Sequence, residues 1–166
     1  MDTTRRSYCT LLAAALAMLL VLSYPASAQE RKVFKTAYSN IRYSDDRALS
    51  DFFWRISGKK LDITVDAYPA RWAVDRIIDR VQSILDMHPD NFRIAIDLRA
   101  AHTRGDIARY LPESNTIVAY ADKISDGVFA HEVSHAVICG YFPEEPPEKI
   151  QEILAQYVDK YLWSDY

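Results

Sequence analysis

The sequence predicts a single small domain in which short strands and helices are mixed, preceded by a signal peptide. The chain has 166 residues, and 49% of them are hydrophobic, which is enough for one compact core. Segments with an apolar residue at every second position are interspersed with segments whose apolar residues recur at helical spacing. We find no internal repeat, low-complexity stretch or interdomain linker.

The N-terminal residues have the pattern of an export signal. Arg5 and Arg6 precede the apolar run 11–22, and Ala-Ser-Ala at 26–28 matches a cleavage site. The run is shorter than the roughly 20 residues that a transmembrane helix needs. Residues 1–28 are therefore predicted to be a signal peptide, leaving residues 29–166 as one periplasmic or secreted domain with no stable membrane span. Adjacent arginines leave both general and twin-arginine export open.

Charge and cysteine content exclude several classes of protein. Removing residues 1–28, which hold Asp2, Arg5 and Arg6, changes the formal charge from −3 to −4. No basic run along the sequence suggests a nucleic acid or an anionic membrane as partner. Cys139 is the one cysteine after residue 28, so we expect no internal disulfide.

The first half of residues 29–166 predicts alternating short elements. Residues 31–43 are expected to be extended, and a helix follows Asp45 and ends at Gly58. Alternation at Leu61, Ile63 and Val65 predicts a half-buried strand. Residues 70–85 predict the clearest amphipathic helix, and residues 92–98 predict a second strand.

The second half predicts an irregular stretch, a strand and two helices. Residues 99–115 are polar and expected to be irregular, with one helical turn near Ile107–Leu111. Thr116–Ala121 is expected to be a third strand, positioned as a sheet edge that could pair with an extended peptide. A helix over 125–139 has Ser125 as N-cap. The last helix begins near Pro147 and is expected to bury a stripe made of Ile150, Ile153, Leu154, Tyr157, Val158 and Leu162.

The motif His131-Glu132-Val133-Ser134-His135 lies in the first of these two helices. Side chains four residues apart share one helix face, so His131 and His135 can reach one ion at about 2.0–2.1 Å. Glu132 points to the side of that ion and can act on a water molecule there. The motif therefore predicts a zinc site, which for catalysis needs one further protein ligand and one open position.

Histidine and cysteine residues elsewhere do not supply an obvious third ligand. A metzincin would have glycine and histidine where this chain has Ile138 and Tyr141. Cys139 is eight residues from His131, about 12 Å along a helix axis, and is expected to be a small buried side chain. His88 and His102 are expected to lie on the surface.

The two motifs of the last helices resemble those of the gluzincin group of zinc metallopeptidases. The resemblance rests on residues 131–137 and on Gln-Glu-Ile-Leu-Ala-Gln-Tyr at 151–157. It implies Glu152 as the third ligand and Zn²⁺ as the cofactor. The small size is similar to that of minigluzincins, which implies an α+β, zincin-like domain: a short twisted sheet packed on an active-site helix and a second, ligand-bearing helix. Ile153 stands where the group usually has glycine.

The resemblance also implies a reaction. His131, His135 and Glu152 would hold the zinc ion, and Glu132 would be the general base in hydrolysis of a peptide or protein substrate. Tyr141 is the candidate for stabilising the oxyanion. Two alternatives remain: an exported zinc-containing binding protein without turnover, and a zinc amidase that acts on a non-peptide bond such as one in a cell wall.

Position along the last helix also favours Glu152 over the other carboxylates after Gly140. Glu144 and Glu145 belong to a proline-rich turn, whereas ligands need rigid elements. Glu148 complements the helix dipole in the first turn and is the next choice. Asp159 is about two turns beyond Glu152 and has a short side chain, so the helix would have to extend past the ion for this carboxylate to bind it. Gln156, one turn beyond Glu152, is expected to orient it.

Overall fold

The computed structural model describes residues 31–164, so the predicted signal peptide at 1–28 lies outside the described part. Residues from Arg31 onward form one compact unit. Within the described part, four helices and a five-stranded mixed sheet make an α+β fold, as expected. None of the described helices is both long and apolar enough to cross a membrane.

The elements follow the chain in a simple order. They are β1 (Lys32–Lys35), β2 (Ser39–Tyr43), α2 (Asp46–Ser57), α3 (Tyr68–Leu85), β3 (Ile94–Arg99), β4 (Ala108–Leu111), a 3₁₀ turn η1 (Pro112–Ser114), β5 (Thr116–Tyr120), α4 (Asp126–Tyr141) and α5 (Glu148–Tyr161). The strand order in the sheet is β1-β2-β3-β5-β4. The inner pairs β2–β3 and β3–β5 are parallel, and the outer pairs are antiparallel.

Helices α2 and α4 form where the sequence predicts them, and both begin at a residue whose side chain caps the helix. The carboxylate of Asp45 accepts a hydrogen bond from the Arg47 amide at the start of α2. Gly58 ends α2 with a φ of 68°, a conformation that costs glycine little. The hydroxyl of Ser125 accepts from the Val128 amide at the start of α4. The helices predicted for these segments are thus confirmed.

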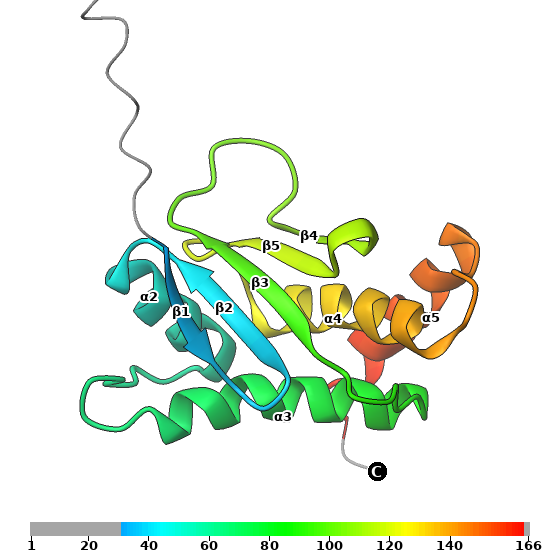
Figure 1. Ribbon diagram of the computed structural model, residues 1–166, viewed down its shortest axis with the longest axis horizontal. Helices are drawn as coiled ribbons and strands as arrows, with labels where there is room; N and C mark the ends of the chain where they lie inside the picture. Colours follow the sequence, from blue (N-terminus) through cyan, green and yellow to red (C-terminus); the bar gives the residue numbers. More distant parts are fainter. Residues whose placement is uncertain (1–30, 165–166) are drawn as a thin grey trace, which may run out of the picture. The chain divides into compact units, whose positions relative to one another are not determined.

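All four helices lie on the same face of the sheet. α2 and α4 contact the strands, and α3 packs against α2, α4 and α5 on the side away from the sheet (Figure 1). The core between sheet and helices is fully buried, and the ring of Phe52 meets that of Phe129 edge to face at 5.6 Å. This packing holds α4 directly beneath the β4–β5 end of the sheet.

The predicted strand at residues 61–65 is wrong, because these residues form turns between α2 and α3. The carboxylate of Asp62 accepts hydrogen bonds from the amide and the hydroxyl of Thr64, at 3.0 and 2.6 Å. This local bonding competes with a strand ladder. Leu61 and Ile63 are partly buried against the core, but Val65 is 83% exposed, so the alternation does not continue along a strand.

The assignment of the sheet edge is corrected as well. Residues 108–111 are not a helical turn but the strand β4, which pairs antiparallel with β5. β5 is therefore an inner strand, between β3 and β4, and β4 is the edge beside α4. Pairing with β5 overrides the polar composition of residues 99–115, which by itself contains no strand pattern.

The predicted buried stripe of α5 is confirmed at Val158 and Leu162, which are buried, and wrong for half of its members. Ile150, Ile153 and Tyr157 are 46–53% exposed. The residues that pack inward share a neighbouring face of the helix: Gln151, Ala155, Val158 and, just after the helix, Leu162. The small side chain of Ala155 allows α5 to approach α4 closely, and polar Gln151 is buried because it has partners there, as described below.

Candidate metal centre

The two histidines and the glutamate of the motif lie on the face of α4 that borders an open cleft. Phe129, Val133 and Val137, on the other side of the helix, are fully buried. Their burial fixes the rotation of α4 about its axis. His131, Glu132 and His135 are consequently held half-buried, with their polar atoms turned toward the cleft.

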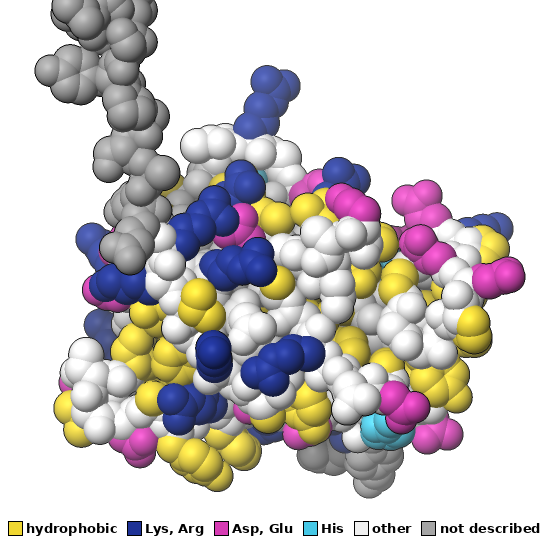
Figure 2. Space-filling model, viewed as in Figure 1, with side chains coloured by type: hydrophobic (Ala, Val, Ile, Leu, Met, Phe, Trp, Pro, Cys, Tyr) yellow, Lys and Arg dark blue, Asp and Glu magenta, His cyan; other side chains and the backbone are white. Residues whose placement is uncertain are grey.

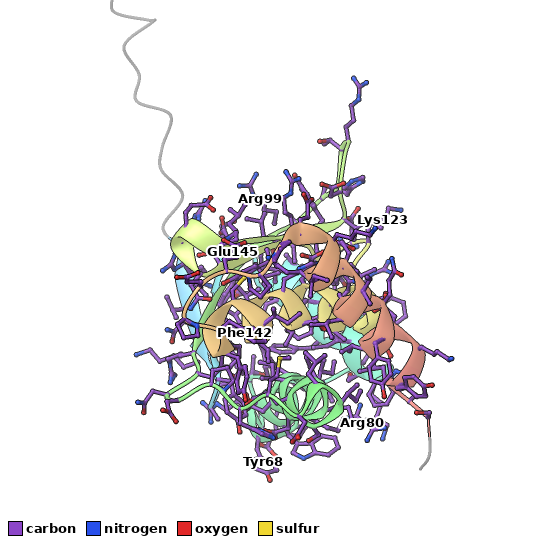
Figure 3. All side chains as sticks on the ribbon, turned by 90° about the vertical axis from the view of Figure 1, so that its right-hand side faces the viewer. Tyr68, Arg80, Arg99, Lys123, Phe142 and Glu145 are labelled. Carbon is purple, nitrogen blue, oxygen red and sulfur yellow. The ribbon has the colours of Figure 1, made fainter. Side chains whose placement is uncertain are left out.

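α5 runs back along α4 after a connection of only six residues, 142–147. Its C-terminal end is tied to α3 by the guanidinium of Arg80, which donates to the carbonyl oxygens of Tyr161, Leu162 and Ser164 at 3.3, 3.1 and 2.8 Å. Glu145, in the connection, and Arg80, on α3, lie on opposite sides of the helix pair (Figure 3). Both ends of α5 are therefore anchored.

Glu152 of α5 meets the two histidines of α4. The Nε2 atoms of His131 and His135 are 3.3 Å apart. The Glu152 carboxylate oxygens lie 3.6 Å from Nε2 of His131 and 3.3 Å from Nε2 of His135. These three side chains form a group whose ligand atoms could hold one metal ion.

A chain of hydrogen bonds orients His135. The Nδ1 atom of this ring lies 3.2 Å from Oε1 of Gln151. The Gln151 amide nitrogen donates to Glu145 Oε1 and to the carbonyl of Pro146, at 3.1 and 2.8 Å. Because these partners fix which way the amide points, its oxygen faces the ring and Nδ1 is the protonated nitrogen. The lone pair of Nε2 is then free to face the centre.

Asp159 orients His131 in the same way. Its Oδ2 atom lies 3.1 Å from Nδ1 of His131, so the carboxylate accepts the ring N–H and leaves Nε2 directed at the centre. α4 and α5 are antiparallel, and His131 precedes His135 by one turn. A partner for His131 must therefore lie further along α5 than Glu152, which is the signal that identifies Asp159.

Glu132 contacts the edge strand instead of the triad. Its Oε2 atom accepts a hydrogen bond of 2.7 Å from the backbone amide of Tyr110 in β4. Tyr120 of β5 donates its amide to the carbonyl of Ile107. In an antiparallel ladder, residues whose backbone groups bond the partner strand alternate with residues whose N–H and C=O groups point away from it. Since Ile107 bonds β5, the backbone groups one and three residues further along point away from β5. Ala108 and Tyr110 thus direct their backbone groups toward the open edge and the cleft.

The cleft enclosed by these elements has a volume of about 710 Å³. It runs between the β4 edge and the N-terminal half of α5, with the triad at its floor. Its charged lining is predominantly acidic: Asp106, Glu132, Glu145, Glu148 and Glu152, with Arg109 and the two histidines. The space is large enough for a segment of extended chain.

Several predicted participants lie elsewhere. Gln156, predicted to orient Glu152, is exposed. Gln151 and Asp159, which the sequence did not single out for this role, contact the two histidines. Glu148 lines the cleft but is not part of the triad. Tyr141 is 47% exposed and packs on Phe142 at the end of α4, six residues or about 9 Å beyond His135, so it does not reach the triad.

Cys139 does not join the triad either. Partial burial raises the pKa of its thiol to about 11, with a further contribution from the nearby charge of Glu145. The thiolate that would bind a metal is therefore disfavoured. Burial, followed by nearby negative charge, raises the pKa of the Tyr110 hydroxyl to about 12. His88 is exposed as expected, whereas the half-buried ring of His102 bonds the Gly105 carbonyl at 2.8 Å.

The chain was compared with known proteins at three levels. No protein-family model matches it, and neither the curated proteins nor the solved structures contain a match.

Proposed function

We propose that this protein is a zinc-dependent metallopeptidase that acts outside the cytoplasm. The observation that carries the proposal is the convergence of His131, His135 and Glu152, with Glu132 beside them and directed into the same cleft.

The donor set and its spacing fit a zinc ion. Two imidazoles and one carboxylate are the usual protein ligands of a catalytic zinc site, which keeps its fourth position open. A tetrahedral ion with bonds of about 2.0–2.1 Å places its ligand atoms about 3.3–3.4 Å from one another. The separations among the three side chains are 3.3, 3.3 and 3.6 Å. His131, His135 and Glu152 would therefore hold the ion with little rearrangement.

Each residue around the triad has a task in amide hydrolysis. When bound, zinc supplies a positive charge that lowers the pKa of water and polarises a carbonyl group. Glu132 accepts a proton from the attacking water and returns it to the leaving amine. Asp159 and Gln151 hold the two imidazoles in the required orientation and tautomer. The Tyr110 amide keeps the Glu132 carboxylate at the mouth of the cleft.

The edge strand supports a peptide as the substrate. β4 presents the backbone groups of Ala108 and the carbonyl group of Tyr110 to the cleft, while the Tyr110 amide is bonded to Glu132. An extended peptide can pair with these open groups and lie across the triad. The short sheet above α4, with α5 beside it, also supports the zincin-like arrangement that the resemblance to gluzincins implies.

Glu132→Gln tests this assignment most directly. The substitution removes the base but keeps the size of the side chain. We expect peptide hydrolysis to fall by at least about 10²-fold, while bound zinc stays near one per chain by elemental analysis. The substrate is a mixed peptide library followed by mass spectrometry, and Glu144→Gln, in the connecting turn, is the matched control.

The same measurement separates the alternatives. Loss of zinc in Glu132→Gln, or activity equal to that of the parent, contradicts the role of Glu132. Zinc binding by the parent without cleavage of any peptide would favour a non-catalytic zinc protein. Zinc binding with hydrolysis of cell-wall fragments alone would favour a non-peptide amidase.

A further inference from the structure

The face of the sheet that carries no helix is strongly basic. Backbone pairing places one residue from every strand in a row across this face: Val33, Arg42, Asp97, Val118 and Arg109. Side chains alternate along a strand, so residues two positions away point to the same side. Because Ile41, Ile96 and Ala119 are buried against the helices, this row lies on the outer side.

Six basic side chains lie on that outer face. Four are placed there by alternation along the strands, and Arg31 by its ion pair with Asp97 at 2.7 Å. Arg93 directly precedes β3 and donates to the carbonyl oxygens of Thr36 and Ala37, in the turn between β1 and β2. They are Arg31, Lys35, Arg42, Arg93, Arg99 and Arg109, all exposed. We call this set the basic sheet face. Arg99, from β3, points away from the side of the molecule where Tyr68 and Arg80 of α3 lie (Figure 3).

Few carboxylates offset these charges. Asp97 is the one acidic residue at the outer strand positions, 14% exposed and held by Arg31 and by Arg99 at 3.9 Å. Asp106, before β4, lies 3.8 Å from Arg109. The face is therefore clearly positive, although the whole chain has a formal charge of −3. Figure 2 shows Lys and Arg side chains over the strands and Asp and Glu side chains gathered near α5.

We propose that the basic sheet face docks on an anionic lipid membrane. Five of its six basic side chains are arginines, whose planar guanidinium groups bind phosphate oxygens in pairs. The charges are spread in two dimensions, over strands that together span about 19 Å at the usual spacing. Such a spread suits a plane of phospholipid headgroups, with a contribution of roughly 1 kcal/mol from each basic residue near the surface.

The arrangement fits nucleic acid less well. Single-stranded nucleic acid is bound along a groove that interleaves positive charge with stacking aromatic side chains, and Tyr120 is the one aromatic residue at the outer strand positions. None of the described helices projects from this face toward a duplex groove.

Vesicle binding tests the proposal on the full chain. We compare binding to vesicles of phosphatidylcholine with binding to vesicles of equal parts phosphatidylcholine and phosphatidylglycerol. The neutral vesicles measure the contribution of apolar segments, so the ratio of the two partition coefficients isolates the charge effect. The double variant Arg42→Gln/Arg99→Gln should lower this ratio roughly 30-fold, since 1 kcal/mol per residue is about fivefold. High salt should lower the ratio for the parent.

Two further variants make the result specific. Lys149→Gln/Lys160→Gln, on α5, removes the same net charge from another surface and should leave the ratio within about twofold of the parent. Arg42→Lys/Arg99→Lys restores the charge and should recover most of the binding. Circular dichroism of every variant establishes that it is folded, and none of these residues belongs to the proposed zinc site.

Three results would overturn the proposal. These are equal binding of the parent to the two kinds of vesicle, equal losses in the two glutamine variants, or tight binding of single-stranded RNA by the basic sheet face without lipid binding. Because the readout is lipid binding, none of them depends on whether the protein hydrolyses peptides.

Discussion

Individual residues of α5 determine how the two histidines face a metal ion. Asp159 and Gln151 bind the outer ring nitrogens of His131 and His135, so each Nε2 atom keeps a lone pair toward Glu152. Removing partners of this kind lowers metal affinity, because they fix both the tautomer and the angle of the imidazole ring. The proposed centre therefore depends on five side chains, two of which would not touch a bound ion.

The orienting role of Asp159 predicts a loss of metal affinity without loss of a ligand. Asp159→Ala should weaken zinc binding by about 10- to 100-fold, measured by competition with a chromophoric chelator. Gln156→Ala, at an exposed position on the same helix, should have no effect. Equal affinities in the two variants would show that the Asp159 contact does not support the centre.

The identity of the third ligand leads to a stronger prediction. Glu152→Ala should lower zinc affinity by more than the loss of an orienting partner does, hence by more than about 100-fold. Glu148→Ala removes a carboxylate that lines the cleft outside the triad and should change affinity little. Zinc retention in Glu152→Ala equal to that of the parent would move the third ligand to Glu148.

At the scale of elements, the position of α5 decides whether the triad forms. Its N-terminal end is held through Gln151, which bonds Glu145 and Pro146 in the connection from α4. Its C-terminal end is held by Arg80 of α3, whose guanidinium satisfies three carbonyl groups that no helical amide can reach. α3 therefore contributes to the centre although it supplies no ligand.

Removing this anchor should destabilise the fold. Arg80→Ala is expected to lower the free energy of unfolding by about 2 kcal/mol, because three carbonyl groups lose a charged donor. Urea denaturation followed by circular dichroism measures this. The control is Arg47→Ala on α2, whose 87% exposed side chain forms one ion pair at 3.8 Å and should contribute less than about 0.5 kcal/mol. A similar small loss in both variants would contradict the anchoring role.

At the scale of the whole molecule, the sheet and the outer helix α3 are joined through the turn between β1 and β2. The Asp75 carboxylate accepts from the amides of Ala37 and Tyr38, at 3.1 and 3.3 Å. A hydrogen bond to Asp79, together with burial and the charges of Asp79 and Asp75, raises the pKa of the Tyr38 hydroxyl to about 12. Protonated Tyr38 is therefore favoured in the folded state.

This raised pKa predicts how stability depends on alkaline pH. The stabilisation from Tyr38 is complete below its unfolded pKa of about 10 and is lost as the pH rises toward 12. Chemical denaturation between about pH 9 and 11 should show this loss in the parent and a smaller one in Tyr38→Phe. Tyr68→Phe, at a 68% exposed position, should behave like the parent. Identical pH slopes for the parent and Tyr38→Phe would contradict the contact with Asp79.

The sequence alone was sufficient for features that depend on neighbouring residues. Periodicity and capping residues placed the helices α2, α3 and α4, and the spacing of His131 and His135 placed both on one helix face. Glu152 was reached by resemblance and by its position on the next helix, and the structure brings it to the histidines. The helices and the histidine spacing are local features because a helix closes its hydrogen bonds within four residues.

Tertiary structure decided the features that depend on residues distant in the chain. β4 is a strand only because β5 pairs with it, and α5 buries Gln151 instead of Ile153 because the polar partners of Gln151 lie in the connection from α4. Asp159 meets His131 only because the two helices run antiparallel. The basic sheet face combines residues from four strands that are scattered along the sequence, so the sequence contains no basic run from which the face could be predicted. In each case the deciding contact joins segments whose separation a local pattern does not encode.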